Sequence, residues 1–356
     1  MRVMLYVMQA LITILLAVNI GPGAGMQYRQ PQFAANDRMV AVVFGAGSTV
    51  YFSASHDQGR TFSAPVKVAE APLLALGRHR GPRVAITPSA IVVSALVGTK
   101  TPPGSDGDLK AWRSTDGGRT WSSGVSMNDV TASAREGLHS MVSGPDGTLF
   151  ASWLDLRQKG TTLYGATSKD GGATWSKNTL VYRSPSGTIC QCCHPTAIFD
   201  AKGGIHVMWR NALDGNRDMY VAYSSDNGVT FQSAQKLGVN FWKLEACPMD
   251  GGGLAFDRNG KLVSIWRRES DVYIAEEGAA ETKIESGKDA AIAIGHDGVY
   301  AVWTSSGAVH ARVPSAAQPI TLAARGDFPQ LISVPNGPML AAWEDDGQIF
   351  IQPVRK

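Results

Sequence analysis

The sequence has little net charge and no long run of like charges. Lys and Arg number 33 against 30 Asp and Glu, which gives a net charge of +3, and charged residues make up only 18% of the 356 residues. This pattern gives no indication of nucleic acid as a partner. The apolar fraction of 44% is that of a folded globular chain and excludes intrinsic disorder.

Helical periodicity is also lacking outside the N-terminal segment. Residues 3–20 form an uncharged run after a basic start at Arg2, and Gly23 and Gly25 follow at the spacing that a signal peptidase prefers. We therefore expect residues 1–25 to be a secretory signal peptide without a lipid-carrying Cys. Residues 26–356 would then fold in the periplasm or outside the cell, with no stable membrane insertion. The alternative is an uncleaved anchor, because 18 apolar residues can just span a bilayer.

Short turn motifs recur along the chain. Four segments share the pattern Ser-x-Asp-x-Gly-x-Thr-aromatic, and their aspartates are Asp57, Asp116, Asp170 and Asp226. The Ser and Asp oxygens can accept backbone N–H bonds in a tight turn, and the Gly supplies a positive φ. The motif therefore predicts a structural turn between two strands, with no catalytic role.

A second repeat extends to the end of the chain. A turn and an apolar run lead to a large apolar residue in seven units, at Phe44, Leu96, Trp153, Trp209, Trp266, Trp303 and Trp343. Each run is preceded by another short strand, at residues 32–35, 83–87, 140–144, 196–199, 253–256, 290–294 and 330–334. Short strands at regular spacing, four to a unit, predict an all-β fold with a single β-propeller. We count seven blades, and because the last three units are short, six blades is the alternative.

The repeats resemble the Asp-box, or BNR, repeats of the sialidase superfamily over essentially the whole mature chain. The resemblance implies Asp boxes on the face away from the active site. It also implies an Arg of an Arg-Ile-Pro motif that binds the substrate carboxylate, and the matching segment of this sequence contains Arg80. An Asp general acid would follow about two dozen residues later, at Asp108 or Asp106. The family's Tyr nucleophile near the chain end has no match, because the last Tyr is Tyr300.

All four cysteines lie in two short segments. These segments hold six candidate metal ligands: Cys190, Cys192, Cys193, His194, Cys247 and Met249. Both segments immediately precede the innermost strand of a unit, as do Arg80 and His139 in two earlier units. Those connections crowd around one mouth of a propeller channel, so we expect all of these residues to face one pocket, with Arg80 and His139 as candidate substrate-binding groups.

Thiol, thioether and imidazole groups are soft donors that favour copper(I). We therefore expect an exported propeller whose mouth binds copper, another soft metal or a small ligand. One alternative is a non-catalytic recognition propeller in which the cysteines form disulfides, with Cys247 bonded to the cluster and a small Cys190–Cys192 ring. The other alternative is an exo-sialidase-type glycoside hydrolase acting on acidic sugars, with Arg80 and Asp108 as its catalytic residues.

Overall fold

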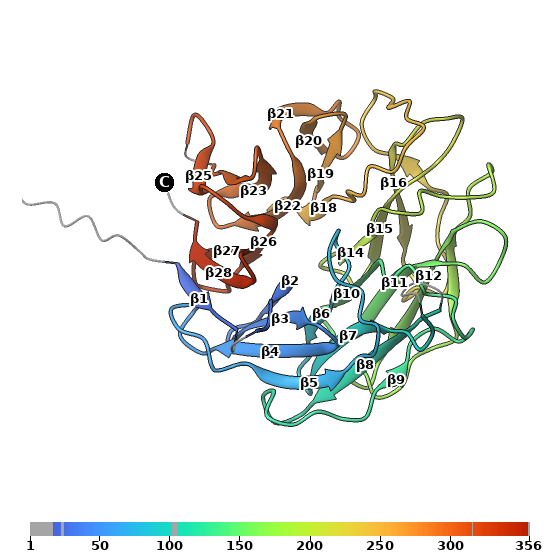
Figure 1. Ribbon diagram of the computed structural model, residues 1–356. Coiled ribbons are helices and arrows are strands. Elements are labelled where there is room, and N and C mark those ends of the chain that lie inside the picture. Colours follow the sequence, from blue (N-terminus) through green and yellow to red (C-terminus); the bar gives the residue numbers. More distant parts are fainter. Residues whose placement is uncertain (1–16, 23–24, 102–105, 315, 355–356) are drawn as a thin grey trace, which may run out of the picture.

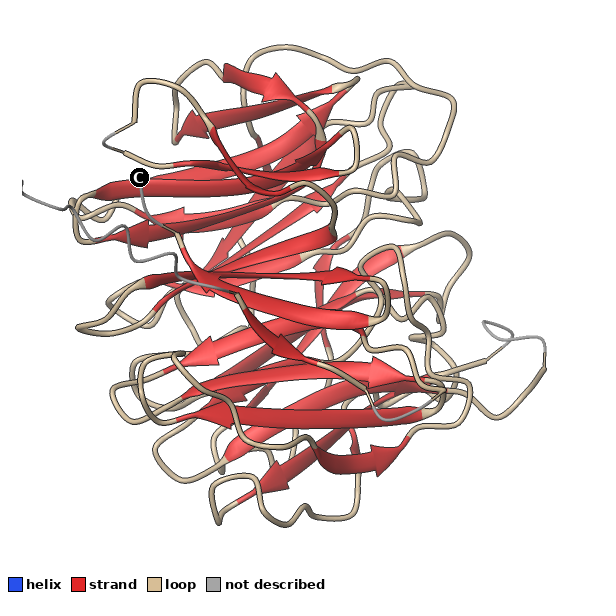
Figure 2. Cartoon of the chain, turned by 60° about the vertical axis from the view of Figure 1, so that its left-hand side comes forward, coloured by secondary structure: helices blue, strands red, loops and turns tan. Residues whose placement is uncertain are grey.

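The structure is a computed structural model that describes residues 17–22, 25–101, 106–314 and 316–354. All regular elements in these ranges are strands, and they form seven four-stranded antiparallel sheets arranged in a ring (Figures 1 and 2). The described part of the chain accordingly contains no helix long and apolar enough to cross a bilayer.

Each sheet is one blade, and its four strands follow one another from the channel to the outside of the ring. In this order, blades 1 to 4 are β2 (Arg29–Ala35), β3 (Val40–Ala46), β4 (Thr49–Ser55) and β5 (Val66–Glu70); β6 (Arg83–Ile86), β7 (Ile91–Val97), β8 (Asp108–Ser114) and β9 (Val125–Ser126); β10 (His139–Ser143), β11 (Leu149–Asp155), β12 (Thr162–Ser168) and β13 (Thr179–Tyr182); and β14 (Thr196–Phe199), β15 (Ile205–Arg210), β16 (Met219–Ser224) and β17 (Gln235–Lys236). Blades 5 to 7 are β18 (Gly253–Phe256), β19 (Leu262–Arg268), β20 (Asp271–Glu276) and β21 (Thr282–Ser286); β22 (Lys288–Gly295), β23 (Gly298–Ser305), β24 (Ala308–Arg312) and β25 (Ile320–Ala323); and β26 (Asp327–Ser333), β27 (Met339–Asp345), β28 (Gln348–Pro353) and β1 (Val18–Ile20).

The seven-bladed prediction is confirmed, and the six-bladed alternative is wrong. The short strands that precede each apolar run are the inner strands, and each packs against the inner strands of both neighbouring blades around the channel. The last three units look short in sequence because their outer connections lack Asp boxes, yet each still forms a four-stranded sheet.

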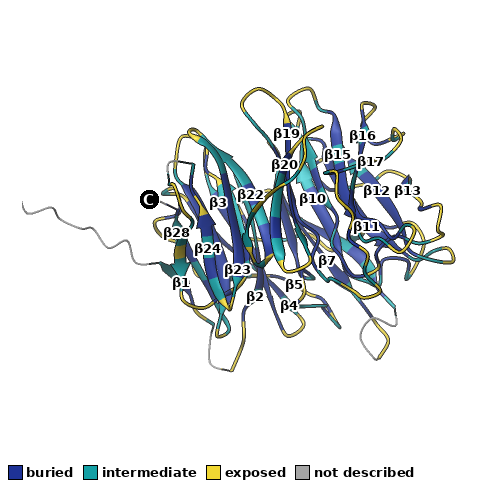
Figure 3. Ribbon diagram, turned by 90° about the horizontal axis from the view of Figure 1, so that it is seen from above, coloured by how far each residue is buried: buried dark blue, intermediate teal, exposed yellow. Residues whose placement is uncertain are grey.

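The core lies between the blades. The apolar residue near the end of each second strand is buried, and Trp153, Trp209 and Trp303 are at most 1% exposed (Figure 3). Burying such large side chains on both faces of every sheet removes much apolar surface from water, and this holds neighbouring blades together.

The Asp boxes form the turns that the sequence predicts. In the first box, the Asp57 carboxylate accepts the Thr61 N–H at 2.9 Å, and the Ser55 hydroxyl oxygen accepts the Gly59 N–H at 2.7 Å. Because strands alternate in direction within a blade, these turns lie at the opposite end of the ring from the connections that precede the inner strands. We call the two ends the Asp-box end and the mouth end.

The N-terminal strand completes the last blade. β1 pairs with β28, Val18 with Ile351 and Ile20 with Ile349, so the first and last parts of the chain share one sheet. Val18–Ile20 belong to the segment that the sequence analysis assigns to a signal peptide. Residues 1–16 of that segment lie outside the described residues, and cleavage near Gly25 stays a prediction.

Candidate functional site

The segment 71–82, which leads into blade 2, reaches across the mouth end of the channel. The Arg78 guanidinium donates to Met249 Sδ at 3.0 Å, in the connection before blade 5. The His79 imidazole lies against His194, in the connection before blade 4, with 4.4 Å between ring centroids. His79 Nε2 is also 2.7 Å from Asp289 Oδ1 in blade 6. The tip of this segment therefore connects blades across the ring.

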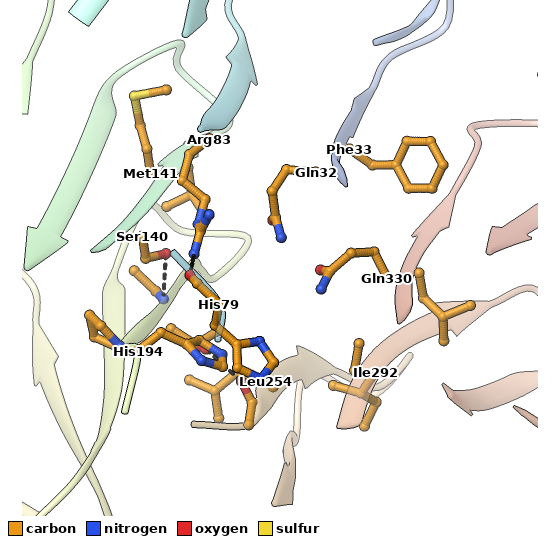
Figure 4. Close-up of a pocket in the computed structure, with 18 of the residues that line it drawn as sticks. Gln32, Phe33, His79, Arg83, Ser140, Met141, His194, Leu254, Ile292 and Gln330 are labelled. Atoms are coloured by element: carbon orange, nitrogen blue, oxygen red, sulfur yellow. Dashed lines mark hydrogen bonds between the residues drawn. The ribbon is translucent and has the colours of Figure 1, made fainter. Parts of the chain in front are cut away.

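A cavity of about 190 Å³ lies within the channel beneath these contacts. Figure 4 shows polar side chains pointing into it from several blades. Its lining includes Gln32, His79, Arg83, Ser140, His194 and Gln330. The cavity is small and polar, as suits an ion or a small ligand.

Arg83 secures the 71–82 segment. Its buried guanidinium donates to the carbonyl oxygens of His79 at 2.6 Å and of His139, in the next blade, at 3.0 Å. Carbonyl oxygens carry only partial negative charge, so burial lowers the pKa of Arg83 to about 10.

The structure brings three of the predicted metal ligands into mutual contact. Cys190 Sγ lies 3.6 Å from both Cys192 Sγ and Cys193 Sγ, and all three sulfurs lie within 4.8 Å of one another. The three side chains are buried, and Met249 packs against them. We call these four residues the sulfur cluster.

The sulfur cluster favours a thiolate at one position. Hydrogen bonds from Cys192 and Cys193 lower the pKa of Cys190 to about 3, and the Arg210 guanidinium acts in the same direction. Burial raises the pKa of Cys193 to about 11, and the hydrogen bond with Cys190 raises the pKa of Cys192. The thiolate at Cys190 is thus stabilised by two neutral thiols.

The other two predicted ligands lie apart from the sulfur cluster. Cys247 is exposed and shares with Cys190 the lining of a surface hollow of about 250 Å³, which also includes Arg217 and Glu245. His194 follows Cys193 in sequence but faces the channel cavity, where its ring lies against that of His79 at an interplanar angle of 31°.

The residues expected from the sialidase resemblance are engaged in structural contacts. Arg80 donates to the Glu136 carbonyl at 2.6 Å and pairs with the Glu136 carboxylate at 3.3 Å. Asp108 accepts the Asn128 amide at 2.6 Å and the Ala132 N–H at 2.7 Å. The Asp106 carboxylate accepts a hydrogen bond from the nearby Thr99 hydroxyl at 2.6 Å. The channel cavity is not lined by Arg80, Asp106 or Asp108, the three residues that the sialidase resemblance implies.

His139 is buried beside the channel. Its Nε2 lies 2.9 Å from Ser94 Oγ, and burial lowers its pKa to about 3, so the imidazole is neutral at physiological pH. It does not line the cavity.

Three charged or titratable residues of the mouth end are absent from the sequence prediction: His79, Asp250 and Asp289. Each lies beside a residue or strand that the sequence does single out, next to Arg80, next to Met249 and at the start of the inner strand of blade 6. The rule that residues just before an inner strand face the mouth would have found all three.

The ring of seven sheets and its Asp-box turns define a sialidase-like seven-bladed β-propeller. Solved structures with the same fold include an ulvan lyase (TM-score 0.61, 12% identity, covering 95% of this chain and 96% of that one). They also include an α-L-arabinofuranosidase from Fusarium graminearum (TM-score 0.59, 12% identity, 96% and 98% covered) and a Hadza microbial sialidase (TM-score 0.53, 15% identity, 92% and 66% covered).

Residues 49–241, more than half of the chain, match the family model described as the BNR repeat-like domain. The chain therefore belongs to the BNR repeat-like domain family. No protein with a curated description matches it in sequence.

Proposed function

We propose that the protein binds copper(I) at the sulfur cluster. The observation that carries this proposal is the convergence of three buried sulfurs, with Cys190 Sγ 3.6 Å from both of its partners. An ion held by three sulfurs at about 2.3 Å in a plane requires sulfurs about 4 Å apart. Shifts of a few tenths of an ångström would accommodate it.

The donor set favours copper(I) over harder ions. Thiolates and a thioether are soft ligands, and Met249 lies against the three thiols. Burial raises the pKa of Cys193, and the Arg210 guanidinium offsets part of that rise while it helps to lower the pKa of Cys190. A metal that binds Cys193 would displace its proton and so form a second thiolate. The hollow beside Cys190 and the exposed Cys247 offers the ion a route to the cluster.

The test is an anaerobic copper(I) titration of the reduced full chain against a chromophoric chelator. We expect one tightly bound equivalent, with affinity falling as pH falls because protons compete for the thiolates. Cys193→Ser should weaken copper(I) binding at least about a hundredfold. Loss of a group that only hydrogen-bonds to a metal ligand typically lowers metal affinity about 10- to 100-fold, and loss of a ligand itself should lower it more. The exposed Cys247→Ser is the matched control and should change affinity much less.

The disulfide alternative gives the opposite result. If mass spectrometry of native protein finds all four cysteines in disulfides, and gently reduced protein takes up no copper, the cysteines form structural disulfide bonds and the proposal fails.

A small ligand or glycan in the channel cavity is a second candidate. It is supported by the polar lining of the cavity and by related folds whose solved complexes hold a -[GlcA(1-4)Rha3S]- oligosaccharide or arabinobiose. A sialidase-type hydrolase that uses Arg80 and Asp108 has less support, because both side chains are engaged by neighbouring residues away from the cavity. Turnover of a fluorogenic sialoside by the wild type, lost in Asp108→Asn, would reinstate it.

A further inference from the structure

A second group of potential ligands lies at the mouth end, beside the sulfur cluster. His79 comes from the connection before blade 2, Asp250 from that before blade 5, and Asp289 from the first strand of blade 6. One ligand atom from each lies within 4.8 Å of the others, and all three residues are buried. Residues far apart in sequence are thus brought to one point by three blades.

The hydrogen bonds of this group leave two carboxylate oxygens without a partner among the described residues, Asp250 Oδ1 and Asp289 Oδ2, and only the second has a salt bridge. Asp250 Oδ2 accepts the Asp289 N–H at 2.9 Å, whereas Asp250 Oδ1 has no hydrogen-bond partner among the described residues, and Asp250 is only 1% exposed. A buried unpaired carboxylate oxygen is costly. The nearby Arg210 does not relieve it, because its guanidinium donates to the backbone carbonyl of Asp250.

One cation is in direct contact with the two buried carboxylates. It is the ammonium group of the half-exposed Lys288, 3.1 Å from Asp289 Oδ2, whereas the Arg210 guanidinium acts on the Asp250 carboxylate only through space. The other Asp289 oxygen contacts His79 Nε2 at 2.7 Å. His194 Nδ1, in the ring that lies against His79, also has no partner within the described structure, but it is not one of the three ligand atoms that lie within 4.8 Å of one another.

We propose that His79, Asp250 and Asp289 form a divalent-cation site distinct from the sulfur cluster. One imidazole and two carboxylates suit Zn²⁺, Mn²⁺ or Fe²⁺, which bind nitrogen and oxygen at about 2.0–2.2 Å, and they do not suit copper(I). His79 and His194 also line the channel cavity, so a small ligand in the cavity could reach the bound ion.

The sequence separates the two sites by single residues. In the connection before blade 5, Met249 belongs to the sulfur cluster and the next residue, Asp250, belongs to the second site. In the connection before blade 4, Cys193 belongs to the sulfur cluster and the next residue, His194, faces the channel cavity. The proposal does not depend on copper binding, and either site can exist without the other.

The test uses Co²⁺ as a spectroscopic probe on the full chain, after silver(I) has saturated the thiols. We expect one equivalent of Co²⁺ with weak d–d absorption and without the intense thiolate-to-cobalt charge-transfer band. Zn²⁺ should displace it. Absence of binding, or a charge-transfer band that shows binding by sulfur only, would overturn the proposal even if copper binds as proposed.

Substitution then locates the ion. Asp250→Asn keeps the acceptor for the Asp289 N–H but removes the charge, and it should weaken Co²⁺ binding at least about a hundredfold. Asp218→Asn is the matched control, a buried aspartate that accepts the Trp242 N–H at 2.8 Å outside this group, and it should bind Co²⁺ as the wild type does. Equal affinity in Asp250→Asn and wild type would refute the site. If Asp250→Asn does not fold, the wild-type spectrum alone decides.

Discussion

The two ends of the propeller are built differently. At the Asp-box end the same bond recurs in four blades, with the aspartate accepting the Thr N–H at 2.9 to 3.0 Å each time. At the mouth end the connections before the inner strands differ from blade to blade, with cysteines before blade 4, Met249 and Asp250 before blade 5, and Asp289 in blade 6. The repeated bonds close the same turn in four blades, while the departures from the repeat gather thiol, imidazole and carboxylate groups at the mouth end.

The two ends use left-handed backbone at different kinds of position. Five residues near the starts of inner strands have left-handed φ values of 51° to 64°, and none is a glycine: Gln30, His79, Met249, Asp289 and Phe328. At the Asp-box end the fifth residue of every box is a glycine with φ between 77° and 91°. Left-handed backbone costs a non-glycine residue energy and is typical of functional sites. The fourth residue of two boxes is also left-handed and not glycine, Gln58 (φ 61°) and Asn227 (φ 59°), so this strain is present at both ends, and only at the mouth end does it fall on the candidate site residues His79, Met249 and Asp289.

The largest expected effect comes from breaking an Asp-box turn. Gly118 has φ +91°, and a Cβ there would lie 2.2 Å from the Phe52 ring in the preceding blade. Gly118→Ala should lower the free energy of unfolding by about 3 kcal/mol, from backbone strain and overpacking together. Urea denaturation measures the change, and copper affinity of the folded protein should not move.

The adjacent Gly117 supplies the control for that substitution. It has φ +78°, but a Cβ there would have no neighbour within 4 Å. Gly117→Ala should therefore cost only the strain, about 1 kcal/mol. Equal losses at both positions would show that blade-to-blade contact at the box adds nothing.

The sequence predicts the Asp-box end better than the mouth end, for a physical reason. A turn such as Ser55 to Thr61 is closed by its own residues, so its motif predicts both its bonds and its place in the blade. The contact between His79 and Asp289 joins residues 210 positions apart and depends on how the 71–82 segment crosses the ring. The repeat register places His79, Asp250 and Asp289 at the mouth end, but no local pattern encodes the crossing that brings them into contact. The three thiols lie within four residues of one another, so their contact can be predicted from the sequence.

The two ends should also lose stability in different pH ranges. At the mouth end, His139 has a folded pKa of about 3 against an ordinary value of 6.5, so the unfolded chain binds the proton first. Stability then falls as pH drops from about 6.5 towards 3, by up to about 1.4 kcal/mol per pH unit. His139→Gln should flatten the profile between pH 6 and 4, as measured by urea denaturation at each pH. An unchanged slope would mean that the folded protein accepts a proton at His139.

At the Asp-box end the loss comes at lower pH. The Thr61 hydroxyl and N–H hold the pKa of Asp57 at about 2, below the ordinary 3.8. The unfolded chain is protonated first here too, so this stability is present above about pH 4 and is lost as pH falls towards 2. Replacing the carboxylate in Asp57→Ala should flatten the profile only below pH 4.

The smallest expected effect comes from replacing Met249 of the sulfur cluster at the mouth end. Met249→Leu nearly conserves volume and should alter the free energy of unfolding by less than about 1.5 kcal/mol. It removes the thioether, so copper affinity should fall about tenfold, less than in Cys193→Ser, on the reasoning that soft donors select copper(I). Met219→Leu, at a buried methionine of β16, controls for the substitution itself and should leave copper affinity unchanged.

The strand pair that closes the ring determines how the molecule responds to force. Val18 pairs with Ile351 and Ile20 with Ile349, so the chain enters β1 and leaves β28 at the same end of this antiparallel pair. A pull that separates the two termini would open these pairs one after another, as a zipper opens, rather than load them together in shear. In a chain that keeps residues 18–20, tension applied between the ends would therefore reach blade 7 first and peel away its outer strand, whereas cleavage near Gly25 would remove that strand before any force acts.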